Sequence, residues 1–157
     1  MSSSAIARPA AISPLICIQI ELGSLPLAVP IDRVEKVVPK SAVVGQDAGP
    51  AGIIYYGDTA VTLLDLQQHL LPASLPTTAE QTGYFLIVRA TQGGLVAVPI
   101  STTPNLVELP QTALKALPPT YRQANLLGIA SHVARIEEQT VFILDVDYLV
   151  TQWHRKP

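Results

Sequence analysis

Short apolar segments separated by turn residues run through most of the chain. The segment LICIQIEL (15–22) is followed by Gly23-Ser24 and then by LPLAVPI (25–31). Such segments, bounded by Gly, Ser and Pro, are typical of β-strands. Farther on, GIIYY (52–56) and TAVTLLDL (59–66) flank Gly57-Asp58, which predicts a β-hairpin.

The same order of features returns after the linker LPASLPTTAEQTG (71–83). A strand YFLIVRA (84–90) leads through Gly93-Gly94 into LVAVPI (95–100), as the first hairpin led into LAVPI. A proline lacks a backbone donor, so within a sheet it occupies an edge, a strand end or a bulge. The repeated VPI phrase therefore predicts one strand end that is built twice.

Three correspondences keep the same order in both halves. Pro30 matches Pro99, Gly52 matches Gly128 and Asp65 matches Asp145, at separations of 69, 76 and 80 residues. We interpret the growing separation as longer loops in the second copy. A long repeat used only twice argues against an open array and favours small closed barrels, which leave no edge strands exposed.

This repeat suggests a division of the chain. We expect residues 1–13 to be a flexible N-terminal segment and residues 14–150 to form one domain. Within it, barrel 1 is expected over roughly 14–76 and barrel 2 over roughly 82–145, with a C-terminal helical turn at 146–153 that packs back. A second short helical turn is predicted in DLQQHLL (65–71), with Asp65 as its N-cap.

Composition narrows the function classes. Hydrophobic residues make up 48% of the chain and charged residues 14%, against about 25% in typical domains. The low charge indicates either apolar surface that faces a partner or simply a core rich in aliphatic side chains. A net charge of −2 without a basic stripe argues against nucleic-acid binding. Because no apolar run approaches the roughly 18 residues that span a bilayer, no direct membrane insertion is expected, and the cytoplasm is the default location.

Few side chains suggest chemistry. The histidines, His69, His132 and His154, are isolated, and Cys17 lies in an apolar strand. Asp145 and Asp147 alternate along a predicted strand and could pair as catalytic carboxylates, but capping of the next helical turn explains Asp65 and Asp145 more simply. No nucleophile elbow, phosphate loop or dinucleotide fingerprint is present. We expect no enzyme, no cofactor and no metal site.

The ordered motifs resemble those of the CheW-like chemotaxis adaptor family. They are ICIQIELG, LAVPIDRVEKVV, GIIYYGDTAVTLLDL, YFLIVRATQGGLVAVPI and LLGIASHVARIEEQTVFILDV, which together cover most of 15–150. The resemblance implies a mainly β fold of two pseudo-symmetric, intertwined, five-stranded SH3-like barrels and no catalysis. It implies two partners, the regulatory domain of a CheA-type histidine kinase and the cytoplasmic tip of chemoreceptors, with membrane association through receptor arrays.

The chain departs from the family pattern at two charged positions. Gly57 stands where an arginine is usual near the hairpin tip, and Lys36 stands where the V-x-E-V segment usually has a glutamate. We hypothesise that Lys36 and Asp58 restore the pairing with reversed sign, the alternative being two independent solvated residues. The candidate partner-binding residues lie around the first hairpin and the V-x-x-V segment: Val34, Lys36, Val37, Ile53, Tyr55, Tyr56 and Asp58.

The sequence therefore predicts a non-enzymatic adaptor that couples a chemoreceptor-type signalling domain to a CheA-type kinase in chemotaxis or related motility control. Two alternatives stay open. One is a regulator that binds the kinase but no receptor, consistent with the missing arginine. The other is a small-ligand-binding β-barrel or an enzyme with an unrecognised site, which a deep pocket with converging polar groups would favour.

Overall fold

β-Strands dominate the computed structural model, which describes residues 13–23, 25–40, 51–66, 83–118 and 129–154. The strands, in chain order, are β2 (Leu15–Leu22), β3 (Leu25–Pro30), β4 (Val34–Pro39), β5 (Ala51–Tyr56), β6 (Thr59–Leu64), β7 (Tyr84–Arg89), β8 (Leu95–Ile100), β9 (Asn105–Leu109), β10 (Leu114–Ala116), β11 (Ala130–Ile136) and β12 (Gln139–Leu144). Two 3-10 helices, η2 (Ile31–Arg33) and η5 (Gln111–Ala113), and helix α3 (Val146–His154) complete them. The segment 1–12, the linker 71–82, His69 and Gly128 lie outside the described residues.

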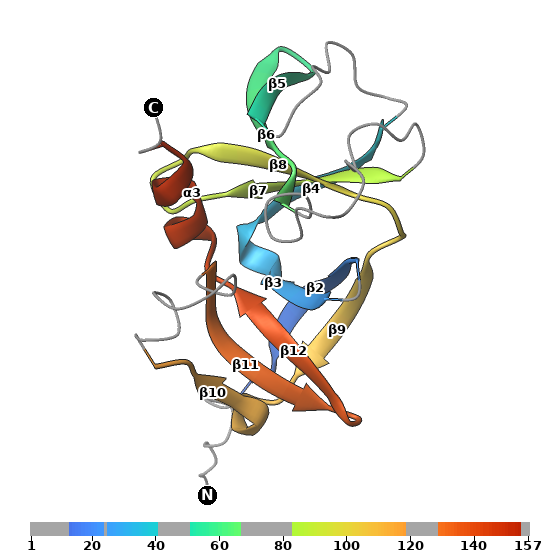
Figure 1. The fold of residues 1–157 in the computed structure, drawn as a ribbon, viewed down its shortest axis with the longest axis vertical. Helices are drawn as coiled ribbons and strands as arrows, with labels where there is room; N and C mark the ends of the chain where they lie inside the picture. Colours follow the sequence, from blue (N-terminus) through green and yellow to red (C-terminus); the bar gives the residue numbers. More distant parts are fainter. Residues whose placement is uncertain (1–12, 24, 41–50, 67–82, 119–128, 155–157) are drawn as a thin grey trace, which may run out of the picture.

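The strands form two sheets, and each sheet curls into a small barrel (Figure 1). One sheet has five strands in the order β4-β7-β8-β6-β5, and the other has six in the order β10-β11-β12-β3-β2-β9. The prediction of a mainly β fold with two pseudo-symmetric SH3-like barrels is thus confirmed. The sixth strand is β10, a three-residue edge strand paired with β11.

The two halves of the chain exchange their first hairpins. The β2–β3 hairpin, from the first half, lies between β12 and β9 of the second half. The β7–β8 hairpin, from the second half, lies between β4 and β6 of the first. The expectation that 14–76 and 82–145 each form one barrel is therefore wrong, because each barrel takes strands from both halves.

Strand register locates the repeat residue by residue. Leu27 of β3 pairs with Phe142 of β12, and Val96 of β8 pairs with Thr62 of β6, both in parallel. Leu27 and Val96 are thus equivalent at a separation of 69 residues, and Thr62 and Phe142 at 80. These separations are the ones predicted from Pro30 with Pro99 and from Asp65 with Asp145, so both matches are confirmed.

The third predicted match, Gly52 with Gly128, is wrong. Gly52 lies opposite Leu63, and the equivalent of Leu63, which is Ile143, lies opposite His132. Gly52 is therefore equivalent to His132. A register shift between Ala130 and His132 inserts an extra residue into β11, and such a bulge displaces every later pairing by one position.

Three hydrophobic clusters hold the barrels together. A small cluster fills the interior of the five-stranded barrel, around Phe85 and Ile54, and another fills the six-stranded barrel, around Leu109 and Cys17. The largest cluster lies between the sheets and draws on both halves of the chain. β2 contributes Cys17 to a barrel interior and Ile20 to the shared cluster, which explains why its sequence is apolar on both faces.

Helix α3 begins at a capped end directly after β12. Asp145 accepts a hydrogen bond from the backbone N–H of Tyr148 at 3.1 Å, and the Leu149 N–H donates to the Asp145 carbonyl at 3.0 Å. This arrangement confirms the predicted N-cap. The helix packs back through Val146 and Leu149, which are buried in the shared cluster. Asp145 and Asp147 do not alternate along a strand, since β12 ends at Leu144.

Candidate partner-binding surface

The outer face of the β5–β6 hairpin exposes large apolar side chains. Ile53 and Tyr55 are 47% and 50% exposed, while Ile54 between them is fully buried in the barrel. Their cross-strand neighbours are Thr62 and Ala60. We refer to Ile53, Tyr55, Ala60 and Thr62 as the β5 surface. Figure 1 shows this hairpin at the end of the molecule opposite β10 and the β11–β12 turn. An exposed aromatic beside an aliphatic side chain is the kind of anchor that protein interfaces use.

Tyr56 faces the other way and packs against the interior cluster of the five-stranded barrel. The Lys36 ammonium lies 5.6 Å from the centre of its ring, within the range of a cation–π contact. Lys36 is on β4 and Tyr56 on β5, the two edge strands of this sheet. The contact therefore bridges two strands that share no backbone pairing in the sheet order.

A bulge in β4 decides where the V-x-x-V segment points. The register shifts between Val34 and Lys36, which lie opposite Val88 and Ile87. In a regular strand, residues three apart face opposite sides, but the extra residue puts Val34 and Val37 on one side. Both are half-buried against the shared cluster between the sheets.

The hypothesised pair between Lys36 and Asp58 is absent. Within the described residues, these two side chains form no ion pair, and Lys36 instead contacts Tyr56. The ion pair near this place joins Glu35 of β4 to Arg89 of β7 at 3.5 Å. Asp58 is exposed at the hairpin tip. The seven predicted residues thus divide among the β5 surface, the edge of its barrel, the shared cluster and the hairpin tip, and they do not form one continuous patch.

A second set of exposed apolar side chains was not predicted. Leu106 on β9 is 65% exposed, Ile31 in η2 is 42% exposed, and Ile16 on β2 is 38% exposed. Leu106 lies opposite Ile18, and Ile31 directly follows Pro30, which lies opposite Cys17. We call Ile16, Ile31 and Leu106 the η2 surface. The sequence did carry a signal for Ile16. LICIQIEL is apolar on both faces, and Ile16 precedes Cys17, the first buried residue of this strand.

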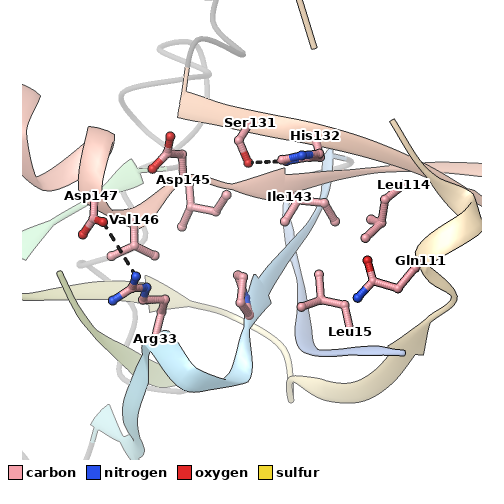
Figure 2. A pocket seen from close by; sticks show the side chains of 12 residues that line it. Leu15, Arg33, Gln111, Leu114, Ser131, His132, Ile143, Asp145, Val146 and Asp147 are labelled. Atoms are coloured by element: carbon pink, nitrogen blue, oxygen red, sulfur yellow. Dashed lines mark hydrogen bonds and ion pairs between the residues drawn. The ribbon is translucent and has the colours of Figure 1, made fainter. Parts of the chain in front are cut away.

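A pocket of about 380 Å³ opens beside this surface, at the start of α3 (Figure 2). Its lining combines apolar with polar and charged side chains: Leu15, Pro30, Arg33, Gln111, Leu114, Ser131, His132, Ile143, Leu144, Asp145, Val146 and Asp147. Figure 2 shows Arg33 directed at Asp147, and Ser131 beside His132, with 2.8 Å between the Ser131 hydroxyl and Nδ1.

The polar groups of the pocket are engaged with the protein. The Asp145 carboxylate caps α3, and Asp147 accepts hydrogen bonds from the N–H and hydroxyl of Thr91 at 2.6 and 2.7 Å. These two bonds, with the weaker influence of Arg33, hold the pKa of Asp147 below its usual range. A carboxyl that stays ionised near neutral pH is a poor general acid, so the arrangement does not suit a paired-carboxylate catalyst.

The remaining candidates are the Cys17 thiol, a metal site and a membrane-spanning helix. Burial, helped by the nearby Asp32, raises the pKa of the Cys17 thiol to about 11, and its thiolate is therefore disfavoured near neutral pH. Within the described ranges, no group of three His, Cys, Asp or Glu residues is placed to hold a metal ion. The helices of the same part of the chain include none long and apolar enough to cross a membrane.

Comparison with known proteins decides the family. The family model of the CheW-like domain matches residues 17–153. The chain belongs to the CheW-like domain family. A solved structure with the same fold is that of the scaffolding protein TtCheW from Thermoanaerobacter tengcongensis, with a TM-score of 0.71 at 14% identity, covering 87% of this chain and 92% of that one. A search of curated proteins finds no match.

The family assignment agrees with the resemblance noted from the sequence motifs. The interior of each barrel holds a cluster of buried hydrophobic side chains. The exposed large apolar side chains lie outside these clusters, in the β5 surface of one barrel and the η2 surface at the other.

Proposed function

We propose that this CheW-like protein is a non-enzymatic adaptor that links the cytoplasmic tip of a chemoreceptor-type signalling domain to the regulatory domain of a CheA-type histidine kinase. It acts in the cytoplasm, in chemotaxis or related motility control, and joins the membrane only through receptor arrays. The observation that carries the proposal is the match to the CheW-like domain over 17–153. Two separate apolar surfaces on barrels with filled interiors support it.

The β5 surface is proposed to bind the kinase. Tyr55 and Ile53 point outward from a hairpin whose inner residues are anchored in the barrel, so their truncation removes contact area with little effect on the core. Tyr56 is a poorer probe, because it packs against the interior cluster and its loss would disturb the barrel itself.

The η2 surface and the neighbouring Val34 and Val37 are proposed to bind the receptor tip. Val34 and Val37 are half-buried against the shared cluster between the barrels, and Val34 immediately follows η2, which carries Ile31. A helical hairpin that brings its own apolar stripe would bury Ile31 and Leu106, which water now contacts.

The test compares equivalent positions of the two barrels. Tyr55 on β5 corresponds to Arg135 on β11, because Tyr55 lies opposite Ala60 and Arg135 opposite Thr140, each 80 residues apart. Tyr55→Ala should weaken binding of the kinase regulatory domain by tenfold or more, of the order of ~1.4 kcal/mol or above for an interface anchor. Arg135→Ala is the matched control and should leave it unchanged. Equal affinities for both variants and the native chain would remove the β5 surface from consideration.

A kinase-binding regulator without receptor binding is the second candidate, favoured by Lys36 at the usual glutamate position and by its contact with Tyr56 instead of Asp58. The same assay with a receptor hairpin in place of the kinase domain separates the two candidates. An adaptor binds both partners, whereas the regulator binds the kinase alone.

A further inference from the structure

One carboxylate connects three segments that are far apart in the sequence. Asp147 is the second residue of α3, yet its oxygens bond away from the helix. Oδ1 accepts the Thr91 N–H at 2.6 Å, and Oδ2 accepts the Thr91 hydroxyl at 2.7 Å. The Arg33 guanidinium approaches Oδ2 at 3.8 Å, as Figure 2 shows. An acidic residue in a first helical turn often only complements the helix dipole, but here it makes specific contacts elsewhere.

These segments belong to different parts of the two-barrel fold. Thr91 lies in the turn of the β7–β8 hairpin, in the five-stranded barrel. Asp147 follows β12 of the six-stranded barrel. Arg33 ends η2, the link between β3 of one barrel and β4 of the other. The Asp147 carboxylate therefore ties the connection between the barrels to both of them.

η2 has few other restraints among its own three residues. None of them is buried, and its N-cap, Pro30, makes no side-chain capping bond. The Val34 N–H closes the turn of η2 by donating a hydrogen bond to the Ile31 carbonyl. The same short helix presents Ile31 at 42% exposure and is followed directly by Val34.

We propose that Asp147 is a positioning residue, which holds Arg33 and Thr91 so that η2 presents Ile31 and Val34 in a fixed orientation to the receptor hairpin. This inference rests on the proposed function for its biological meaning, but the restraint itself is a property of the chain alone. The Arg33 contact is partly exposed on both sides and near the 4 Å limit, so its effect should lie in orientation more than in stability.

The first measurement is hydrogen–deuterium exchange of the Val34 amide in the full chain. Asp147→Ala should speed this exchange between about threefold and thirtyfold, the range expected for loss of a modest structural coupling. Amides of β8 and β12 should keep their protection. Thr91→Val and Arg33→Gln should each reproduce part of the effect, and Asp147→Glu should restore part of it. Asp58→Ala, which removes an exposed carboxylate elsewhere, is the control and should change nothing.

The second measurement compares two partners. Asp147→Ala should weaken binding of a synthetic coiled-coil hairpin that carries a chemoreceptor signalling tip from the same cells by a similar factor, and should leave kinase-domain binding unchanged. Unaltered Val34 exchange in Asp147→Ala, or an equal loss for both partners, overturns the inference. If the native chain binds neither partner, the proposed function fails, while the exchange result still decides whether the restraint exists. If Asp147→Ala does not fold, Thr91→Val and Arg33→Gln decide the same question.

Discussion

The exchange of hairpins predicts that the chain can be cut between its halves without falling apart. A protease recognition sequence in place of residues 75–80 would separate β2–β6 from β7–α3 after cleavage. The first half supplies six buried side chains to the shared cluster, four to the five-stranded barrel and two to the six-stranded barrel. Neither barrel is complete without both fragments, so dissociation requires both barrels to unfold.

The affinity of the cut halves follows from this coupling. Domains are typically stable by about 5–15 kcal/mol. The intact linker acts as an effective concentration of about 1 mM, equivalent to about 4 kcal/mol at the 1 M standard state. Dissociation of the cut chain should therefore cost roughly 9 kcal/mol or more, which corresponds to a sub-micromolar Kd.

The assay is size-exclusion chromatography of the cleaved protein at a concentration of about 10 μM, which is about ten times a Kd of 1 μM. A denaturing gel shows that cleavage is complete. One peak of the native size is expected until denaturant unfolds the protein, and two peaks thereafter. Two separate folded fragments in native buffer would refute the exchange and restore the simpler division of the chain into consecutive barrels.

Three further predictions concern stability and reactivity. Glu137 and Glu138 form the β11–β12 turn with φ of 47° and 67°, a backbone conformation that is strained for glutamate. The double variant Glu137→Asn with Glu138→Gly should therefore raise the free energy of unfolding by about 1 kcal/mol in urea titrations. An unchanged urea midpoint would show that the turn is not strained. Gly83 has a φ of 101°, and an added Cβ would come within 2.3 Å of the Ile100 carbonyl oxygen. Gly83→Ala should therefore lower the free energy of unfolding by about 1–3 kcal/mol or more. A melting temperature equal to that of the native chain would contradict this. Cys17 should resist a thiol reagent at pH 7 and react only as the pH approaches its raised pKa of about 11 or the chain unfolds; rapid labelling of native protein at pH 7 would show that the site is open.

The strands and the repeat could be read from the sequence because local signals agree there. Turn residues bound each apolar segment, and the match of Pro30 with Pro99 survives in the register of β3 and β8. The helix cap at Asp145 was equally readable, since an N-cap depends only on the residues that follow it.

The pairing partners of the hairpins were not readable, because a strand pattern gives the buried face but not the neighbour that covers it. Bulges likewise prevented a full prediction of the site, because an extra residue changes which side of the sheet the following residues face. The V-x-x-V spacing did not show that the bulge at Glu35 places Val34 and Val37 on one side, where both are half-buried against the shared cluster. That they bind a partner stays a prediction. Lys36 contacts the ring of Tyr56 and not the carboxylate of Asp58. Opposite charges in two sequence motifs therefore do not establish a contact.

The adaptor account is tested most directly by a three-component retention experiment. A chemoreceptor signalling hairpin is immobilised, and the kinase regulatory domain from the same cells is passed over it with and without this protein. The account predicts that the kinase domain is retained only when the protein is present, and that Tyr55→Ala abolishes this retention while the protein itself stays bound to the hairpin. Retention of neither component would contradict the account, and binding of the protein to the kinase domain alone would assign it to the regulator class.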